Sequence, residues 1–488
     1  MIDLTINEER LQRTINRCRD RNIIVPTFSQ MKNPDTIPAK IKEQLRQTGL
    51  WDIVPQNLFR ITWKNEPTPK GGLFRSTPNY IELPPELTGV EARIIGLVGK
   101  WFPTGSHKVG ASFGCLVPPL ITGQFDPTQD EAVWPSTGNF CRGGAYDATL
   151  LGCESIAILP EQMSRERFDW LKTVAGEIIA TPGSESNVAE IYDEVWELKR
   201  TRKNIFVFNQ FAEFGNYLFH YDVTGHAIED VVKNEIHGGH FRGVCFTTGS
   251  AGTIASGDYL KQVYPTSKVA AGEALQCPTL LLNGYGAHRI EGIGDKHVPW
   301  IHNIRNTDMV IGIDDNDTMN LLRLFNEPDG RKYLTNEMGV PDAVVSKLDL
   351  LGISSIANVL MAIKFAKYYE LTRKDLVLTV FTDSTELYQS RLQEAREQQG
   401  NYSATNAIRD FHRHLKGLKT DSMMELNYYD KKRIHNLKYF TWIEQQMFNL
   451  DELNRQWYDY ESYWTEPQRL TPRIDDLITK FNERVNLS

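Results

Sequence analysis

The sequence predicts an α/β protein whose mostly parallel, twisted sheets are covered by helices. From about residue 90 onward, short apolar runs rich in β-branched residues alternate with longer amphipathic segments. Glycines and prolines such as Gly176, Gly183 and Pro265 stop several of these segments. The length of 488 residues indicates more than one domain, because a domain usually holds roughly 100 to 200 residues.

Each apolar run defines an expected strand, and each segment with apolar residues three or four apart defines an expected helix. Strands are expected at 93–98, 131–134, 154–159, 177–181, 205–208, 243–247, 309–313 and 376–381. Helices are expected at 140–150, 165–175, 187–200, 224–236, 253–264 and 353–369, and a further helix should begin near Val109. This order of strand, helix and strand is typical of a parallel sheet.

The two ends of the chain depart from this rhythm. Residues 1–88 carry one clear helix, opened by Pro38 and closed by Gly49, and a stretch rich in proline, so we expect a segment that wraps around the protein. Residues 392–488 are polar, charged and aromatic, and we expect a helical extension there. Its apolar stripe should pack on its own protein or, less favoured, form a subunit contact. The stripe consists of Ile443, Met447, Leu450, Leu453, Trp457, Tyr460 and Trp464.

Composition favours a protein that acts on small molecules. The net charge of -8 and the pI of about 5.8 do not favour nucleic acid or an anionic membrane as a partner. The six cysteines are widely spaced without a C-x-x-C pair, which argues against a disulfide framework or a zinc site. The N-terminus lacks the pattern of a secretory signal, and no apolar run reaches the roughly 18 residues of a membrane helix. We therefore expect a cytoplasmic protein.

Lys108 is the first candidate catalytic residue. It lies in Pro103-Thr-Gly-Ser-His-Lys-Val-Gly110, after an expected strand and directly before an expected helix. The positive end of a helix dipole disfavours the ammonium form of a nearby lysine and so favours a nucleophilic amine. Such an amine can form a Schiff base with an aldehyde cofactor.

Two further turns connect a strand to a helix. The loop Gly249, Ser250, Ala251, Gly252 and Thr253 can point successive backbone N–H groups at one anion, which indicates a phosphate site. It is neither a P-loop nor a dinucleotide fingerprint. The turn Ser136, Thr137, Gly138 and Asn139 can present amides and hydroxyls to a carboxylate, and the amide of Asn139 can bond a phenolic oxygen.

Read in order, these motifs resemble the fold-type II pyridoxal-phosphate enzymes, the superfamily of cysteine synthase, cystathionine β-synthase, threonine synthase and the tryptophan synthase β chain. The resemblance covers roughly residues 93–391 and is greatest to the cysteine synthase branch. Further segments that carry it are Gln210-Phe-Ala-Glu, Thr224-Gly, Glu291-Gly-Ile-Gly, Gly352-Ile-Ser-Ser and Thr382-Asp-Ser-Thr-Glu-Leu-Tyr388. His107, directly before the lysine, is more similar to the tryptophan synthase branch.

The resemblance implies pyridoxal 5'-phosphate as the cofactor and assigns a role to each motif. Lys108 would form the Schiff base and move the Cα proton, with His107 beside it. Asn139 would contact the ring hydroxyl, Gly249 to Thr253 the phosphate, and Ser384 the ring nitrogen. Ser136, Thr137, Gly138 and Gln210 would face the substrate carboxylate. No metal site is expected.

The resemblance also implies a fold and a reaction class. The fold would comprise two three-layer αβα domains. The large cofactor domain would consist of 89–108 and 225–391, and the wrapping segment 1–88 would belong to it. The small mobile substrate domain would consist of 109–224. The reaction would be β-replacement or β-elimination on serine, O-acetylserine or a similar amino acid through an aminoacrylate, in a homodimer. Alternatives are a serine or threonine dehydratase, an enzyme like the tryptophan synthase β chain, and a catalytically weak scaffold or binding protein on the same fold.

Overall fold

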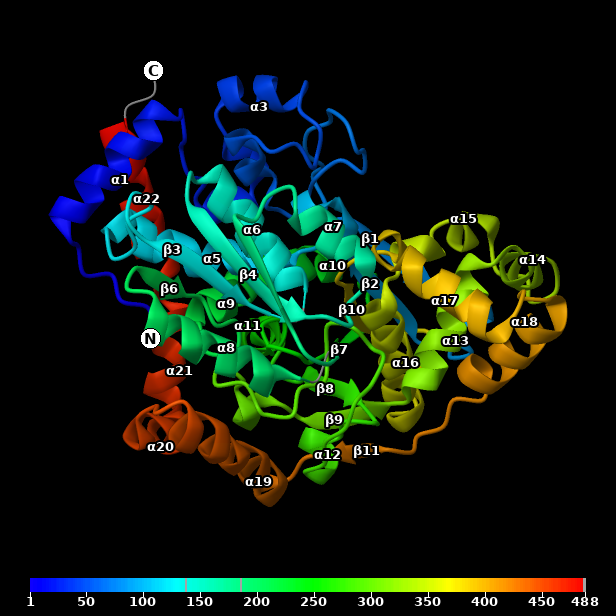
Figure 1. The fold of residues 1–488 in the computed structure, drawn as a ribbon. Helices are drawn as coiled ribbons and strands as arrows, with labels where there is room; N and C mark the ends of the chain where they lie inside the picture. Colours follow the sequence, from blue (N-terminus) through cyan, green and yellow to red (C-terminus); the bar gives the residue numbers. More distant parts are fainter. Residues whose placement is uncertain (137, 185–186, 486–488) are drawn as a thin grey trace.

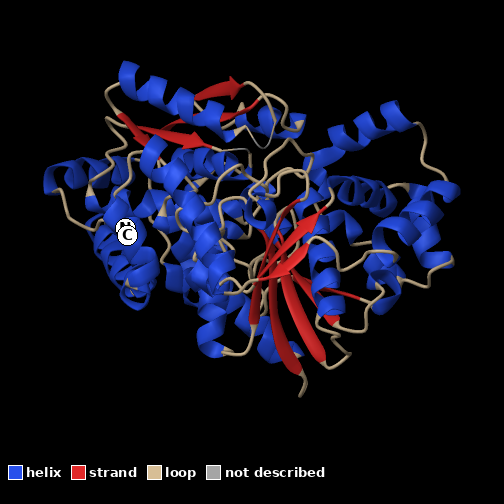
Figure 2. Ribbon diagram, turned by 90° about the horizontal axis from the view of Figure 1, so that it is seen from below, coloured by secondary structure: helices blue, strands red, loops and turns tan. Residues whose placement is uncertain are grey.

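The computed structural model describes residues 1–136, 138–184 and 187–485, and it contains two separate β-sheets (Figures 1 and 2). The first sheet has seven strands in the order β1-β2-β10-β7-β8-β9-β11. Their bounds are β1 Tyr80–Leu83, β2 Arg93–Val98, β7 His240–Thr247, β8 Lys268–Ala274, β9 Met309–Ile313, β10 Asp375–Phe381 and β11 Met423–Glu425. The five central strands are parallel, and the two edge strands β1 and β11 are antiparallel to their neighbours.

The second sheet is parallel throughout and has the order β5-β4-β3-β6. Its strands are β3 Glu131–Pro135, β4 Glu154–Pro160, β5 Glu177–Thr181 and β6 Ile205–Val207. Helices α6 (Asn139–Leu150) and α8 (Val188–Thr201) pack against these strands. The mixed α/β fold with parallel sheets predicted from the sequence is therefore confirmed.

Helices connect and cover both sheets, as Figure 1 shows. Helix α16 (Ile353–Tyr368) is buried over almost its whole length and packs against β7 and β10, which explains its apolar composition. The remaining helices before the extension are α1 Glu8–Asp20, α2 Phe28–Lys32, α3 Ala39–Leu45, α4 Pro85–Thr88, α5 Lys108–Thr122, α7 Arg165–Leu171, α9 Phe214–Phe219, α10 Gly225–Glu235, α11 Ile254–Val263, α12 Thr279–Leu282, α13 Asp315–Asn326, α14 Pro328–Asn336, α15 Asp342–Val345 and α17 Gln389–Gln399.

The C-terminal extension is helical, as predicted, but its apolar stripe does not lie on one helix. The helices are α18 Ala404–Asp410, α19 Tyr428–Lys438, α20 Leu450–Tyr458, α21 Tyr460–Gln468 and α22 Thr471–Val485. The stripe is interrupted between α19 and α20, where Met447 is 76% exposed. Leu453 and Trp464 are buried in one cluster with Phe214 and Trp300, and Trp457 is buried as well, so this part of the stripe packs on its own protein.

The first and last helices lie side by side. Helix α1 packs against α22, which Figure 1 draws in blue and red. Asp475 of α22 accepts hydrogen bonds from the backbone N–H groups of Phe28 (2.7 Å) and Ser29 (3.0 Å) at the start of α2. The sequence-based prediction of one clear helix in 1–88 was incomplete, because it missed α1. The contacts of α22 with α1 and α2 show that the C-terminal extension packs on the N-terminal segment.

In the described part of the chain, no helix is long and apolar enough to cross a membrane. All six cysteines are buried and unpaired, so their sulfur atoms make no disulfide.

Candidate active site

A pocket lies where several parallel strands end, the usual place for a ligand in an open α/β sheet. Lys108 follows β2, Ser136 follows β3, the loop 249–253 follows β7, and Thr382 follows β10. The pocket is lined by His107, Lys108, Ser136, Asn139, Phe140, Gln210, Phe211, Thr247, Gly249, Ser250, Ala251, Gly252, Thr253, Gly292, Ile293, Asp295 and Thr382. The fold therefore brings together most of the residues singled out in the sequence.

Two predicted residues, Ser384 and Gly138, do not line this pocket. Ser384 is 2% exposed and lies at the start of a short helical turn, two residues beyond Thr382, which does line the pocket. Gly138 is buried directly before α6 and donates a backbone hydrogen bond to the Ser136 hydroxyl (3.2 Å). Thr137 lies outside the described residues.

Lys108 is the first residue of α5 and its amine points at the glycine-rich loop. Its Nζ lies 3.0 Å from the Ser250 hydroxyl, which also accepts a hydrogen bond from Asn216 Nδ2 at 3.0 Å. A hydroxyl has two acceptor positions and one hydrogen. Because both acceptor positions are used, the Ser250 O–H is left to donate to an anion in the pocket.

The loop itself is arranged to bind an anion. Within the described structure, none of the backbone N–H groups of Gly249–Thr253 has an intramolecular acceptor, although this segment leads directly into α11. Ala251 has a left-handed φ of 62°, which only a tightly constrained turn imposes on a residue with a side chain. A side-chain carbon on Gly252 would lie 2.2 Å from Asn216 Oδ1, so glycine is required where the loop meets α9. Free N–H groups before a helix suit a phosphate.

Two buried histidines lie beside this loop. The rings of His107 and His220 are 5.0 Å apart, and His107 Nε2 lies 3.2 Å from the Thr382 hydroxyl. Burial is the largest cause that holds the pKa of each histidine well below its usual value, with neighbouring positive groups acting in the same direction. Both rings are therefore neutral at pH 7. Three polar atoms here are buried without a hydrogen-bond partner among the described residues: His107 Nδ1, His220 Nε2 and Asn216 Oδ1. Because buried polar atoms are normally paired, these atoms are candidates to bond a ligand.

Asn139 and Gln210 form the opposite side of the pocket. Asn139 Nδ2 donates to Asp383 Oδ2 (2.6 Å), which leaves its second N–H available. Gln210 Nε2 donates to the Ser136 hydroxyl (3.1 Å), and both residues are buried. The Ser136 oxygen thus accepts from Gln210 and from Gly138, and its own hydrogen is left to donate to a carboxylate.

These features fit one cofactor class. A half-buried lysine amine, an anion loop with unused donors and an amide with a spare N–H are the groups that hold pyridoxal phosphate by its aldehyde carbon, phosphate and ring hydroxyl. The fit rests on this structure alone, through the unpartnered polar atoms and the glycine positions that a side chain would fill.

Comparison with known proteins agrees with this fit. The family model described as "Pyridoxal-phosphate dependent enzyme" matches residues 101–331. The cysteine synthase of Staphylococcus aureus is 29% identical over 289 residues, which are 59% of this chain and 84% of the relative. The cystathionine beta-synthase of Saccharomyces cerevisiae is 25% identical over 318 residues, 62% of this chain and 58% of the relative. The resemblance to fold-type II pyridoxal-phosphate enzymes is confirmed, and the protein is a pyridoxal-phosphate-dependent enzyme.

Solved structures share the fold. The cysteine synthase of Entamoeba histolytica superposes with a TM-score of 0.56 at 22% identity, covering 70% of this chain and 93% of its own. A hydrogen sulfide-producing enzyme of Fusobacterium nucleatum gives a TM-score of 0.55 at 22% identity, covering 64% and 96%. At this identity the likeness concerns the architecture alone.

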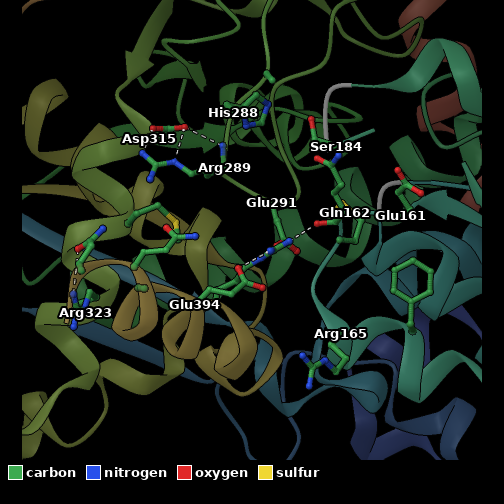
Figure 3. Close-up of a pocket in the computed structure, with 18 of the residues that line it drawn as sticks. Glu161, Gln162, Arg165, Ser184, His288, Arg289, Glu291, Asp315, Arg323 and Glu394 are labelled. Carbon is green, nitrogen blue, oxygen red and sulfur yellow. Dashed lines mark hydrogen bonds and ion pairs between the residues drawn. The ribbon is translucent and has the colours of Figure 1, made fainter. Parts of the chain in front are cut away.

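A larger cleft of about 870 Å³ lies beside the cofactor pocket (Figure 3). Glu291 lines this cleft, while the next two residues, Gly292 and Ile293, line the pocket, so one segment belongs to both walls. Charges of both signs line the cleft and many are paired, as Arg289 is with Asp315 at 2.6 Å. The segment 291–293 therefore borders both spaces.

Sequence reasoning missed several residues at or next to the site, among them Asn216, His220, Asp383 and Arg167. Asn216 lies in α9 and His220 is the first residue of the π-helical segment that continues it. The two residues are four apart and face the loop from the same side. Two polar residues at helical spacing in the apolar run after Gln210 were the available signal. Asp383 and Arg167 do not line the pocket and contact it through other residues. No local pattern in the sequence marks them.

Proposed function

We propose that the enzyme catalyses β-replacement or β-elimination on a serine-type amino acid such as serine or O-acetylserine. The observation that carries the proposal is the Lys108 amine 3.0 Å from Ser250 in the phosphate loop, in the same pocket as the Ser136–Gln210 pair. A base and a carboxylate site that converge on one cofactor position are what α-proton chemistry on an amino acid requires. The named relatives, a cysteine synthase and a cystathionine beta-synthase, support the same reaction class.

The residues would hold the cofactor as follows. Backbone N–H groups of 249–253 and the Ser250 hydroxyl would bind the phosphate, with His107, His220 and Asn216 beside it. Asn139 would donate its second N–H to the ring hydroxyl. When bound, pyridoxal phosphate withdraws electrons from the substrate Cα and so makes its proton removable.

Lys108 would then move that proton. Its amine is half-buried at the first position of α5, where the helix dipole disfavours the ammonium form. Ser136 and Gln210 would orient the substrate carboxylate, because the Ser136 hydrogen is free to donate once its oxygen accepts from Gln210. This placement would keep the Cα–H bond directed at Lys108.

Two hydroxyls at the end of β10 are candidates to face the ring nitrogen. Ser384 is the residue that the family motif suggests, and Thr382 is the one that lines the pocket. A hydroxyl cannot stabilise a protonated ring nitrogen by charge as a carboxylate would. A neutral ring is a weaker electron sink, which favours loss of a β substituent over transamination. We also propose a homodimer in the cytosol, with a small substrate domain formed by 109–224.

The test is a spectrum of the purified enzyme during addition of serine, O-acetylserine, O-phosphoserine, threonine and cysteine in turn. We expect a visible cofactor band that shifts with one serine-type donor, and mass spectrometry should find a β-substituted product when sulfide or another nucleophile is added. Release of a keto acid and ammonia without a nucleophile would instead identify a dehydratase. A band that no donor shifts would contradict the proposal, and Lys108→Ala is the control for reaction at the site.

A further inference from the structure

Arg167 is a completely buried cation outside the pocket, on helix α7 next to the four-stranded sheet. Its guanidinium forms an ion pair with Glu291 and donates to the Tyr388 hydroxyl at 2.9 Å. Its Nη2 also lies 3.9 Å from Asp383 Oδ2. All three partners lie in segments that follow strands of the seven-stranded sheet, whereas α7 connects β4 to β5 of the four-stranded sheet. Arg167 therefore links elements that belong to the two sheets.

Asp383 carries this contact to the pocket. Its Oδ2 accepts from Asn139 Nδ2 at 2.6 Å and from the Tyr388 hydroxyl at 2.7 Å. On the other side, Asn139 Oδ1 accepts from Arg142 at 3.4 Å. The amide of Asn139 is therefore held at both ends, with its nitrogen toward Asp383 and its oxygen toward Arg142. One N–H of known direction is left for a ligand.

A second contact acts through the backbone. A side-chain carbon on Gly138 would lie only 2.7 Å from Arg167 Nε, so the guanidinium packs against the residue that precedes Asn139. Arg167 thus touches the site twice, through the carboxylate of Asp383 and through the start of α6.

Charge makes this arrangement dependent on Arg167. Asp383 is completely buried, and burying a carboxylate is costly unless a positive group or hydrogen bonds compensate it. Without Arg167, Asp383 would take up a proton more readily. A protonated carboxyl group carries a hydrogen on one oxygen, which then donates instead of accepting. The hydrogen bond from Asn139 to Asp383, which orients the Asn139 amide, would therefore weaken.

We propose that Arg167 is a positioning residue: through Asp383 and Gly138 it fixes the orientation of Asn139, and through Glu291 it ties this orientation to the segment shared by the pocket and the cleft. The inference rests on the proposed function only where turnover is measured. Its effect on cofactor binding is independent of which amino acid reacts.

The experiment compares Arg167→Lys, Arg167→Met and Tyr388→Phe with the wild-type enzyme. Arg200→Met is the matched control, because Arg200 is exposed on α8 and pairs with its helix neighbour Glu197. The first readout is the pyridoxal phosphate dissociation constant and the wavelength of the bound cofactor band. Both report on the contact to the ring hydroxyl without any substrate.

For Arg167→Met we expect cofactor affinity to fall about 10- to 100-fold, with a displaced absorption band. With an active donor, kcat should fall about 10- to 100-fold while KM changes less than about threefold, because the loss concerns orientation and not substrate binding. Arg167→Lys should recover part of the loss, since it restores the charge but not the planar contacts. Arg200→Met should match the wild type.

Unchanged cofactor affinity and band in both Arg167→Met and Tyr388→Phe would overturn the inference. If Arg167→Met does not fold, Tyr388→Phe still decides, because it removes only one hydroxyl that bonds both Arg167 and Asp383. Should no amino acid react with the wild type, the proposed function would fail, but the cofactor measurements would still decide the role of Arg167.

Discussion

The amine of Lys108 lies 3.0 Å from the hydroxyl of Ser250, a residue 142 positions later in the chain. One residue starts a helix after β2, and the other lies in the turn after β7. Because both turns follow parallel strands of one sheet, they meet at the same edge of it. The catalytic amine and the phosphate loop are thus placed together by the topology.

Replacing Ser250 by alanine should weaken cofactor binding. The Ser250 O–H is the hydrogen left to donate to the phosphate, and a hydrogen bond to a charged group contributes about 1.5–3 kcal/mol. We therefore expect the pyridoxal phosphate dissociation constant of Ser250→Ala to rise by about 10- to 100-fold in a spectral titration. Ser256→Ala is the control, because the Ser256 hydroxyl donates to the nearby Thr253 carbonyl and has no other partner among the described residues. Equal affinities in the two variants would contradict this role.

Replacing Lys108 by alanine should abolish the covalent link to the cofactor. Reduction of the wild-type enzyme with borohydride should leave the cofactor on the peptide that contains Lys108, and the variant should carry none. Because Lys108 is also the proposed base, turnover should fall by about 10²- to 10⁴-fold or more. Lys172→Ala removes an exposed lysine directly after α7 and should keep the label. A label on another lysine of the wild type would refute the assignment.

The buried histidines should make stability depend on pH. The pKa of His220 lies well below its usual value, chiefly because of burial, so the unfolded chain binds a proton below about pH 6.5 that the folded chain does not. The stability from this residue is present above that pH and is lost as the pH falls, by about 1.4 kcal/mol per pH unit. In the cofactor-free protein, His220→Asn should lose about 2 kcal/mol less than the wild type between pH 6.5 and 5.

Urea denaturation at the two pH values measures this difference. His237→Asn is the control, because the side chain of His237 is 69% exposed and its removal should leave the slope unchanged. A slope that both variants share with the wild type would show that His220 does not contribute to it.

Much of the fold could be predicted because strand and helix patterns are local. The strand 93–98 was predicted to the residue, and the helix of 353–369 to within one residue of α16. Strand β8 was missed because Lys268-Val-Ala-Ala-Gly-Glu-Ala contains only one β-branched residue, and its position between β7 and β9 is set by burial. Strands β1 and β11 are short edge strands of four and three residues, and the partner of β11 is distant in the sequence.

The candidate site followed the same division. Lys108 and the loop 249–253 could be predicted because each is a strand-to-helix turn with a local motif. Asn216 and His220 appear in the sequence only as two polar residues at helical spacing, because the helix that carries them reaches the loop only after folding. Asp383 lies beside the predicted Ser384, but its bond to Asn139 spans 244 positions. Contacts of this kind depend on the topology of both sheets.

The C-terminal extension should support the site through α9. Trp464 is 3% exposed, and its ring lies 6.1 Å from that of Phe214 and 5.6 Å from that of Tyr217, the residues that flank Gly215 and Asn216. Removing a buried tryptophan leaves a large cavity and typically costs about 3–5 kcal/mol. We expect Trp464→Ala to lower the free energy of unfolding by that amount.

Trp464→Ala should also weaken cofactor binding, because α9 can shift and Asn216 would no longer hold the Ser250 hydroxyl at 3.0 Å. Tyr458→Ala is the matched control: Tyr458 lies in the same extension but is 72% exposed, so its loss should change stability by no more than about 0.5 kcal/mol. Denaturation and cofactor titration of both variants measure the two effects. A Trp464→Ala protein that is destabilised but binds the cofactor normally would show that the extension stabilises the fold without shaping the phosphate site.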